Sequence, residues 1–451
     1  MLLASAGTKK INCKIGDSLM GQLHIRNCDY IRDDLEANCV FLSDGREKII
    51  LISCDLAVLL SDFVERVRQG ISGKTAVPCQ NIHIFCTHTH TGPNTAGLLP
   101  DDPVNAEYLK NLENWLVELA QEVHSSAKEA KIASGKGNAL IGYNRRVCWM
   151  DGSHTMYGDT AKDDFAGIEG PEDSTHCVVS IVDKEGKHIA IIHNNACHST
   201  TVENSNFVSA DFPGEARRLI RDMLDRKDLP VLYIQGASGD LSPWNLLSRK
   251  KRVPGIQRMK EIGAVLACET LRIISEIEYE DEAVLKNVTE KLIMRVRLPE
   301  PDTLKKAQKI VEDGEKKSGR WKYVLSWSIL KLYQDYRNNP VEEIPVSAIR
   351  IGDCGIATNP YEYYCQFGID IRRRSPAKIT MIAQLADGWY GYCPTVYGIV
   401  GGGYSGMTIY WTRHQFEAGY IVADICARLL YKLWKQEERW QKNSQSMVET
   451  N

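Results

Sequence analysis

The 451-residue sequence lacks several features that would assign it to a class at once. No apolar stretch approaches the ~20 residues of a membrane span, and the net charge at pH 7 is only −3. A near-neutral chain has no general attraction to nucleic acid or to an anionic membrane surface. We therefore expect a soluble protein with no transmembrane segment and no nucleic-acid partner.

The 14 cysteines include no CxxC pair and are spread along the whole chain, unlike those of a small disulfide scaffold. Four lie in apolar runs and are interpreted as small buried hydrophobic residues: Cys39, Cys54, Cys268 and Cys426. The opening MLLASAGTKK is too short and too quickly charged for a signal peptide. We expect a reducing, cytoplasmic location, or secretion if a signal peptide has been removed.

Short β-like runs alternate with helical segments along most of the chain. Buried strands are predicted over 48–59 and 81–90, and a hairpin over 177–199. Helices are predicted where apolar residues recur at three- and four-residue steps: 61–75, 105–130 and 258–277. The alternation indicates an α/β (mixed α+β) fold with a large mixed β-sheet core and surrounding helices.

No linker divides the chain clearly, so a single domain over residues 1–435 is predicted, followed by a polar tail over 436–451. The sequence pattern changes over 278–347, where an acidic start and a strand of alternating apolar and polar residues precede a charged helical stretch. We treat this segment as a subdomain or an insertion. No internal repeat of about 20–50 residues is present.

The most informative segment is Cys86-Thr87-His88-Thr89-His90-Thr91-Gly92-Pro93. If the strand continues through it, His88 and His90 share one face, about 6.6 Å apart. Neutral imidazole is the commonest zinc ligand, so the pair is a candidate metal site. Taken alone, an HxH pair is equally well explained by hydrogen bonding inside a core.

Other polar residues lie at the ends of predicted strands or in loops, and each also has a purely structural explanation. His198 ends the apolar strand of HNNACHST, and Ser242 lies in the loop GASGDLSP, where tight turns are common. Glu362 lies near a helix start, where a carboxylate favours the helix dipole. Tyr392 and Tyr404 lie in loops rich in tyrosine and glycine.

Taken together and in this order, these segments resemble the motifs of the neutral (non-lysosomal) ceramidase family. The matching segments span about residues 10–430 and are THTHTGP, NNACHST, GDLSP, Pro360-Tyr361-Glu362 and DGWYGYCPT. The resemblance implies a zinc-dependent hydrolase with a neutral-ceramidase-like catalytic domain. It implies zinc ligands at His88, His198, Glu362 and Tyr392.

The same resemblance assigns roles around the metal. His90 matches a histidine that faces the substrate, and Arg145 and Tyr404 match substrate-binding and catalytic positions. In the GDLSP loop, Asp240 is a substrate-binding candidate and Ser242 a catalytic one, regarded as a nucleophile. An attack by metal-activated water does not require Ser242.

The chain also departs from the family pattern. The family's C-terminal immunoglobulin-like domain has no counterpart in the sequence, and the segment between Tyr392 and Tyr404 is glycine-rich. Asp387 stands where relatives carry Asn, and the segment after His198 reads differently. These departures lie around the substrate and not around the metal, so they bear on ceramide as the substrate and not on hydrolysis. An N-acyl compound smaller than ceramide is favoured, because a sphingolipid needs a long apolar cleft and access to a membrane, and the sequence shows no membrane element.

The predicted function is hydrolysis of an amide (N-acyl) bond in a small-molecule or lipid substrate by zinc-activated water. An esterase or lactam hydrolase with the same centre is an alternative. A binuclear amidohydrolase would need a regular (β/α)₈ pattern, which the chain does not show. A catalytically inactive binding paralogue is disfavoured because all four ligand types are present.

Overall fold

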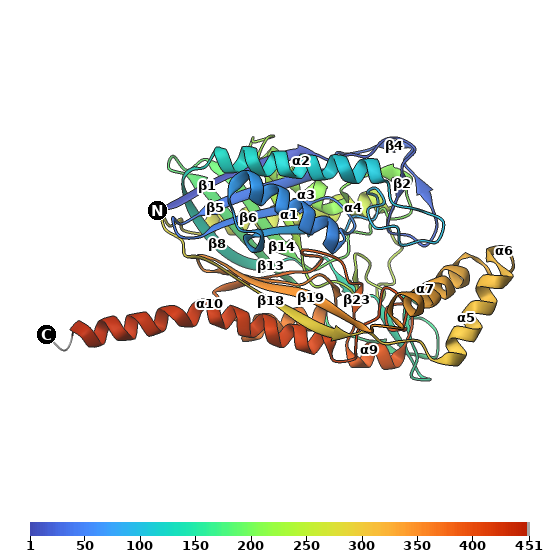
Figure 1. Ribbon diagram of the computed structural model, residues 1–451. Coiled ribbons are helices and arrows are strands. Elements are labelled where there is room, and N and C mark those ends of the chain that lie inside the picture. Colours follow the sequence, from blue (N-terminus) through green and yellow to red (C-terminus); the bar gives the residue numbers. More distant parts are fainter. Residues whose placement is uncertain (449–451) are drawn as a thin grey trace.

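The computed structural model describes the backbone of residues 1–448 and the side chains of residues 1–435. Its centre is an eight-stranded sheet in the order β16-β14-β13-β8-β1-β5-β6-β7 (Figure 1). The pairs β6–β7 and β14–β16 are parallel, and the other neighbours are antiparallel. The strand bounds are β1 (Leu2–Lys10), β5 (Glu36–Ser43), β6 (Lys48–Cys54), β7 (Ile82–Cys86), β8 (Lys128–Asn138), β13 (Thr175–Asp183), β14 (His188–Asn195) and β16 (Val231–Gln235).

A second, four-stranded sheet packs on one face of the first. It consists of β18 (Leu285–Arg295), β19 (Val341–Ile351), β20 (Cys354–Thr358) and β22 (Ile379–Ala383). The two-residue period of β6 explains this packing, because successive side chains point to opposite faces. Ile49 and Leu51 join the core between the sheets, whereas Ile50 and Ile52 join the core on the helical side.

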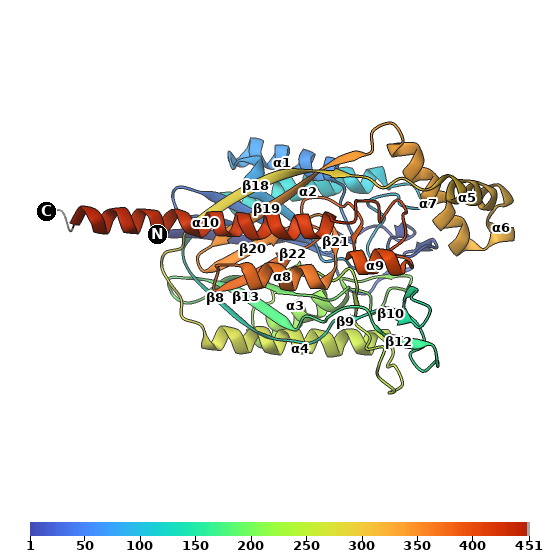
Figure 2. The ribbon, with the colours of Figure 1, turned by 90° about the horizontal axis from the view of Figure 1, so that it is seen from below.

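Helices cover both outer faces, so the molecule has four layers in the order helices, sheet, sheet, helices (Figures 1 and 2). The eight-stranded sheet is covered by α1 (Ser61–Thr75), α2 (Ala106–Ser125), α3 (Asp211–Met223) and α4 (Gly255–Glu276). The four-stranded sheet is covered by α8 (Cys365–Arg374) and α10 (Ala418–Val448). The fold class predicted from the sequence is confirmed.

Helix α2 shows how local sequence sets these layers. The side chain of its N-cap residue, Asn105, accepts a hydrogen bond from the backbone N–H of Tyr108. Leu112, Leu116 and Leu119 are buried at three- and four-residue steps, so one stripe of the helix faces the sheet. The helix ends at Ser125 and β8 begins at Lys128, so the predicted helix over 105–130 is too long at its C-terminal end.

The segment between β18 and β19 forms the helices α5 (Pro301–Asp313), α6 (Glu315–Ser318) and α7 (Arg320–Tyr336), which lie together at one end of the molecule (Figure 1). β18 and β19 pair with each other, so these helices form an insertion between two adjacent strands of one continuous sheet. Most of the predicted polar tail continues α10 as far as Val448, and residues 449–451 lie outside the described part.

Short elements connect the layers. They are β2 (Ser18–Leu19), β3 (Arg26–Asn27), β4 (Tyr30–Ile31), η1 (Cys79–Asn81), β9 (Tyr143–Asn144), β10 (Arg146–Trp149), β11 (His154–Met156), β12 (Phe165–Ile168), β15 (Phe207–Val208), β17 (Leu241–Ser242), β21 (Glu362–Tyr363), β23 (Tyr392–Cys393) and α9 (Val396–Gly401).

Other predictions can be compared with the structure directly. The helix over 61–75 and the hairpin over 177–199 are confirmed. Every cysteine in the described residues is a free thiol, and Cys39, Cys54 and Cys426 are buried as expected, but Cys268 is exposed on α4. Within residues 1–448, no helix combines the length and apolar character that a membrane span requires.

Candidate metal centre

The predicted strand over 81–90 ends early, at Cys86, so the extended arrangement predicted for His88 and His90 is wrong. The backbone of His88 has a φ of +65°, in the left-handed region that non-glycine residues rarely adopt. Its N–H donates to the carbonyl of Leu56, which belongs to the loop after β6. The chain therefore turns at His88, and the rings of His88 and His90 nevertheless lie close together.

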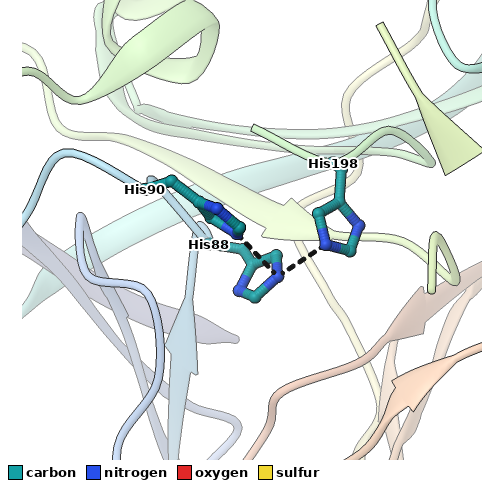
Figure 3. Close-up of side chains that lie close together, drawn as sticks. All are labelled: His88, His90 and His198. Atoms are coloured by element: carbon teal, nitrogen blue, oxygen red, sulfur yellow. Dashed lines mark hydrogen bonds between the residues drawn. The ribbon is translucent and has the colours of Figure 1, made fainter. Parts of the chain in front are cut away.

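Three imidazoles converge there, although they come from the ends of two different strands (Figure 3). Nε2 of His88 lies 2.9 Å from Nε2 of His198, which follows β14, and 3.4 Å from Nε2 of His90. Nε2 of His88 and Nε2 of His198 lie 3.4 and 3.5 Å from Oε2 of Glu362. All four side chains are buried or nearly so.

The other ring nitrogens of two histidines fix their tautomers. Nδ1 of His88 lies 2.8 Å from the carbonyl oxygen of Ala57, and Nδ1 of His198 lies 2.8 Å from that of Ser238. A carbonyl oxygen only accepts hydrogen bonds, so in neutral rings both Nδ1 atoms carry the proton. Both Nε2 atoms then present lone pairs to each other and to the carboxylate. This donor set fits a divalent cation, which would replace mutual repulsion by coordination.

Glu362 and Tyr392 are brought together by strand pairing. They are register partners in the two-stranded parallel pair of β21 and β23, so their side chains are neighbours. Burial alone would raise the pKa of Glu362, but hydrogen bonding to His198 and attraction to His88 hold that pKa well below its usual value. Oε1 of Glu362 also accepts a hydrogen bond from Nε1 of Trp389, at 3.0 Å.

Arg145 lies directly behind the cluster. Its Nη2 lies 3.1 Å from Nε2 of His198, 3.3 Å from Oη of Tyr392 and 2.9 Å from the carbonyl oxygen of Gly239. Its Nη1 donates to Oη of Tyr157, at 3.3 Å. A buried guanidinium therefore adjoins the same oxygen and nitrogen atoms that could hold a metal.

A pocket opens onto the cluster from the other side. Its walls combine His88, His90, Glu362, Tyr392 and Tyr404 with apolar side chains, chiefly Leu19, Met20, Leu98, Leu99, Trp389 and Trp411. The cavity volume is about 80 Å³, which corresponds to a handful of water molecules at roughly 10–15 Å³ each. The ring of Tyr404 lies between those of Tyr392 and Trp321, with centroid distances of 5.7 and 5.5 Å.

The GDLSP loop supports the site from behind and, in the described residues, does not line this pocket. The hydroxyl of Ser242 is engaged with the backbone N–H and carbonyl of Trp244, both at 3.2 Å. Asp240 accepts hydrogen bonds from Asn144 and from the N–H of Cys365, and burial raises its pKa to about 7. Its carbonyl also accepts the N–H of Arg145.

Two contact residues had no assigned role in the sequence analysis. Trp389 lies inside the DGWYGYCPT motif, but nothing in the motif pairs it with Glu362. Glu203 follows His198 by five residues, and its Oε2 lies 3.7 Å from Nδ1 of His90. The spacing and periodicity of the sequence predict neither contact. One joins two loops that are distant in the sequence, and the other depends on a loop that folds back on itself.

Comparisons with known proteins agree with the motifs. Neutral ceramidase A and neutral ceramidase B of Dictyostelium discoideum are each 24% identical to this chain, over 222 and 221 residues. The match covers 45% of this chain and 30% of each relative, so it spans less than a third of their length. No protein-family model matches the chain.

Two solved structures share the fold. A ceramidase complexed with C2 superposes with a TM-score of 0.74 at 16% identity, and neutral ceramidase from Pseudomonas aeruginosa with a TM-score of 0.74 at 17% identity. Each superposition covers 96% of this chain and 75% of the other. The resemblance predicted from the motifs is confirmed in sequence and in fold.

Proposed function

We propose that this chain, which is neutral-ceramidase-like in sequence and fold, hydrolyses an amide (N-acyl) bond with a zinc ion held by His88, His198, Glu362 and Tyr392. The convergence of two Nε2 lone pairs with Oε2 of Glu362, all within 3.5 Å of one another, is the observation that carries this proposal. Two imidazoles, a carboxylate and a phenol oxygen are suitable zinc ligands.

When bound, zinc would act as a Lewis acid and lower the pKa of a water ligand toward ~7. Side chains of the protein would carry out the proton transfers and stabilise the developing charge. Burial lowers the pKa of His90 well below its usual value, so its ring is neutral and free to take a proton from the attacking water. The same ring can return that proton to the leaving amine nitrogen as the carbon–nitrogen bond breaks.

Two further groups would stabilise the oxygen that becomes negative. Burial raises the pKa of Tyr404, so its hydroxyl stays protonated and can donate to the former carbonyl oxygen. Arg145 keeps a positive charge 3.3 Å from Oη of Tyr392 and so favours negative charge at this point. Asp240 positions Arg145 through the backbone, and Ser242 is not needed as a nucleophile.

The pocket supports an N-acyl substrate with a modest acyl group. Apolar side chains such as Leu98, Leu99 and Trp411 suit an acyl chain. A cavity of about 80 Å³ is small for the long chains of ceramide, so we favour a smaller N-acyl compound. Ceramide, an ester or a lactam remain outcomes of the assay.

The test combines metal analysis with a substrate series. Zinc would be measured in the purified protein by plasma mass spectrometry, and hydrolysis of N-acyl amines of increasing acyl length would be compared with ceramide and with esters. His198→Ala should lose both zinc and activity, whereas His188→Ala, which changes a partly buried histidine of β14 outside the site, should keep both. Full activity in His198→Ala would exclude this metal centre.

A further inference from the structure

His90 carries a buried nitrogen that the proposed chemistry does not use. Among the described residues, its Nδ1 has no hydrogen-bond partner. The nearest acidic atom is Oε2 of Glu203, 3.7 Å away. This distance is too long for a hydrogen bond, but a shift of about 0.5 Å or one bridging water would complete one.

The backbone of His90 is anchored by hydrogen bonds on both sides, and Gly21 packs against the ring itself. The carbonyl of His90 accepts Nη2 of Arg26 at 2.6 Å, and its N–H donates to the carbonyl of Ser199 at 3.4 Å. Gly21 lies against the ring so closely that an added Cβ would be 2.5 Å from Cγ of His90. In this orientation Nε2 faces His88 and Nδ1 faces Glu203.

Glu203 is itself held in place. Its carboxylate accepts a hydrogen bond from the side chain of Gln22, which lines the catalytic pocket beside His90. Burial raises the pKa of Glu203, whereas the positive charges of Arg145 and Arg26 oppose that shift. The side chain remains 25% exposed, so it can adjust without disturbing the core.

We propose that Glu203 is a positioning residue for His90. Its carboxylate accepts the Nδ1–H of His90, fixes the tautomer in which Nε2 carries the lone pair, and holds the ring toward the reacting bond. This inference rests on the proposed amide hydrolysis, in which His90 moves a proton to the leaving amine. A carboxylate behind a proton-carrying imidazole also stabilises the transient imidazolium.

The test uses the dependence of rate on the leaving group. An alkylamine leaves only when its nitrogen is protonated, whereas the phenolate of an aryl ester leaves without a proton. Both rates are measured at about pH 8–9, where a water whose pKa zinc would lower to ~7 is already ionised and needs no base. Glu203→Ala should then lower kcat by about 10–100-fold on an N-acyl alkylamine, with a much smaller loss on the aryl ester of the same acid. Glu203→Gln, which keeps an acceptor oxygen, should lie between Glu203→Ala and the wild type.

Glu113→Gln is the matched control, because Glu113 is also partly buried and pairs with a single arginine, Arg66, away from the pocket. It should leave both rates unchanged. Equal losses of Glu203→Ala on amide and ester would show a general structural defect and would overturn the proposal, as would no loss on either.

A second measurement separates this inference from the proposed function. High-resolution crystal structures of wild type and Glu203→Ala, each loaded with zinc, should show His90 Nδ1 bonded to Glu203 directly or through one water in the wild type and a turned ring in the variant. An unchanged ring orientation overturns the positioning role. Wild-type protein that hydrolyses neither substrate refutes the proposed function, and the crystallographic comparison still decides the role of Glu203.

Discussion

Replacing Gly21 by Ala tests whether the position of His90 matters for turnover. Gly21 has a φ of +112°, and a Cβ there would lie 2.5 Å from Cγ of His90, whereas ordinary contacts begin at 3.4 Å. The ring must therefore move by 3.4 − 2.5 = 0.9 Å, or the loop must move instead. A misplacement of about 1 Å costs on the order of 100-fold in rate. We expect kcat/KM for an N-acyl amide to fall by that factor.

The control for this change is Gly16→Ala. Gly16 has a φ of +92° in the same N-terminal region, but an added Cβ would meet nothing within 4 Å. Both variants carry backbone strain of about 1–3 kcal/mol, so their free energies of unfolding by urea should fall similarly. Only Gly21→Ala should lose activity, and it should keep the proposed zinc, because the three atoms nearest to the added Cβ all belong to His90. Equal activities of the two variants would refute the reasoning.

Three other changes test separate parts of the structure. Burial lowers the pKa of His176 from 6.5 to about 4. Its contribution to the free energy of unfolding is therefore complete above pH 6.5 and is lost as the pH falls toward 4. In urea titrations, His176→Gln should reduce the loss of unfolding free energy between pH 6.5 and pH 4 by about 3 kcal/mol. Trp389→Phe removes the donor to Glu362 and should weaken zinc binding by about 10–100-fold in a chelator competition. Ser242→Ala should retain its turnover number, because this hydroxyl is bonded to the backbone of Trp244; a loss as large as that of His198→Ala would make Ser242 a catalytic group.

The elements that depend on local sequence were predictable. The apolar spacing of α1 and the turn between β13 and β14 are determined by residues close together in the chain, and both predictions are confirmed. The turn at His88 was not predictable, because the alternating threonines and histidines favour an extended strand. Bonds from His88 to the carbonyls of Leu56 and Ala57 override that preference, and both partners lie about thirty residues earlier in the chain.

The partners of the candidate ligands were also not predictable, because they are distant in the sequence. Glu362 and Tyr392 each appear in a short motif, but only the pairing of β21 with β23 makes them neighbours. Glu203 faces His90 because the loop after His198 folds back toward the hairpin loop that carries Gln22. A contact between two loops produces no periodic pattern in the sequence, so it is seen only in the three-dimensional structure.

The convergence of His88 and His198 depends on the curvature of the large sheet. Counting strand pairs from β14 to β7 gives opposite directions, so in a flat sheet their carboxyl ends would lie at opposite edges. The right-handed twist between neighbouring strands accumulates across the sheet and turns its first edge strand, β16, across β5, β6 and β7.

Two hydrogen bonds mark this crossing. Asn38 of β5 accepts the N–H of Val231 at 3.3 Å, and Ser53 of β6 donates to the carbonyl of Tyr233 at 2.6 Å. The end of β16 is thereby brought toward the end of β7, and the adjacent β14 carries His198 with it. Because every neighbouring pair contributes to the twist, the geometry of the candidate metal centre depends on the whole sheet.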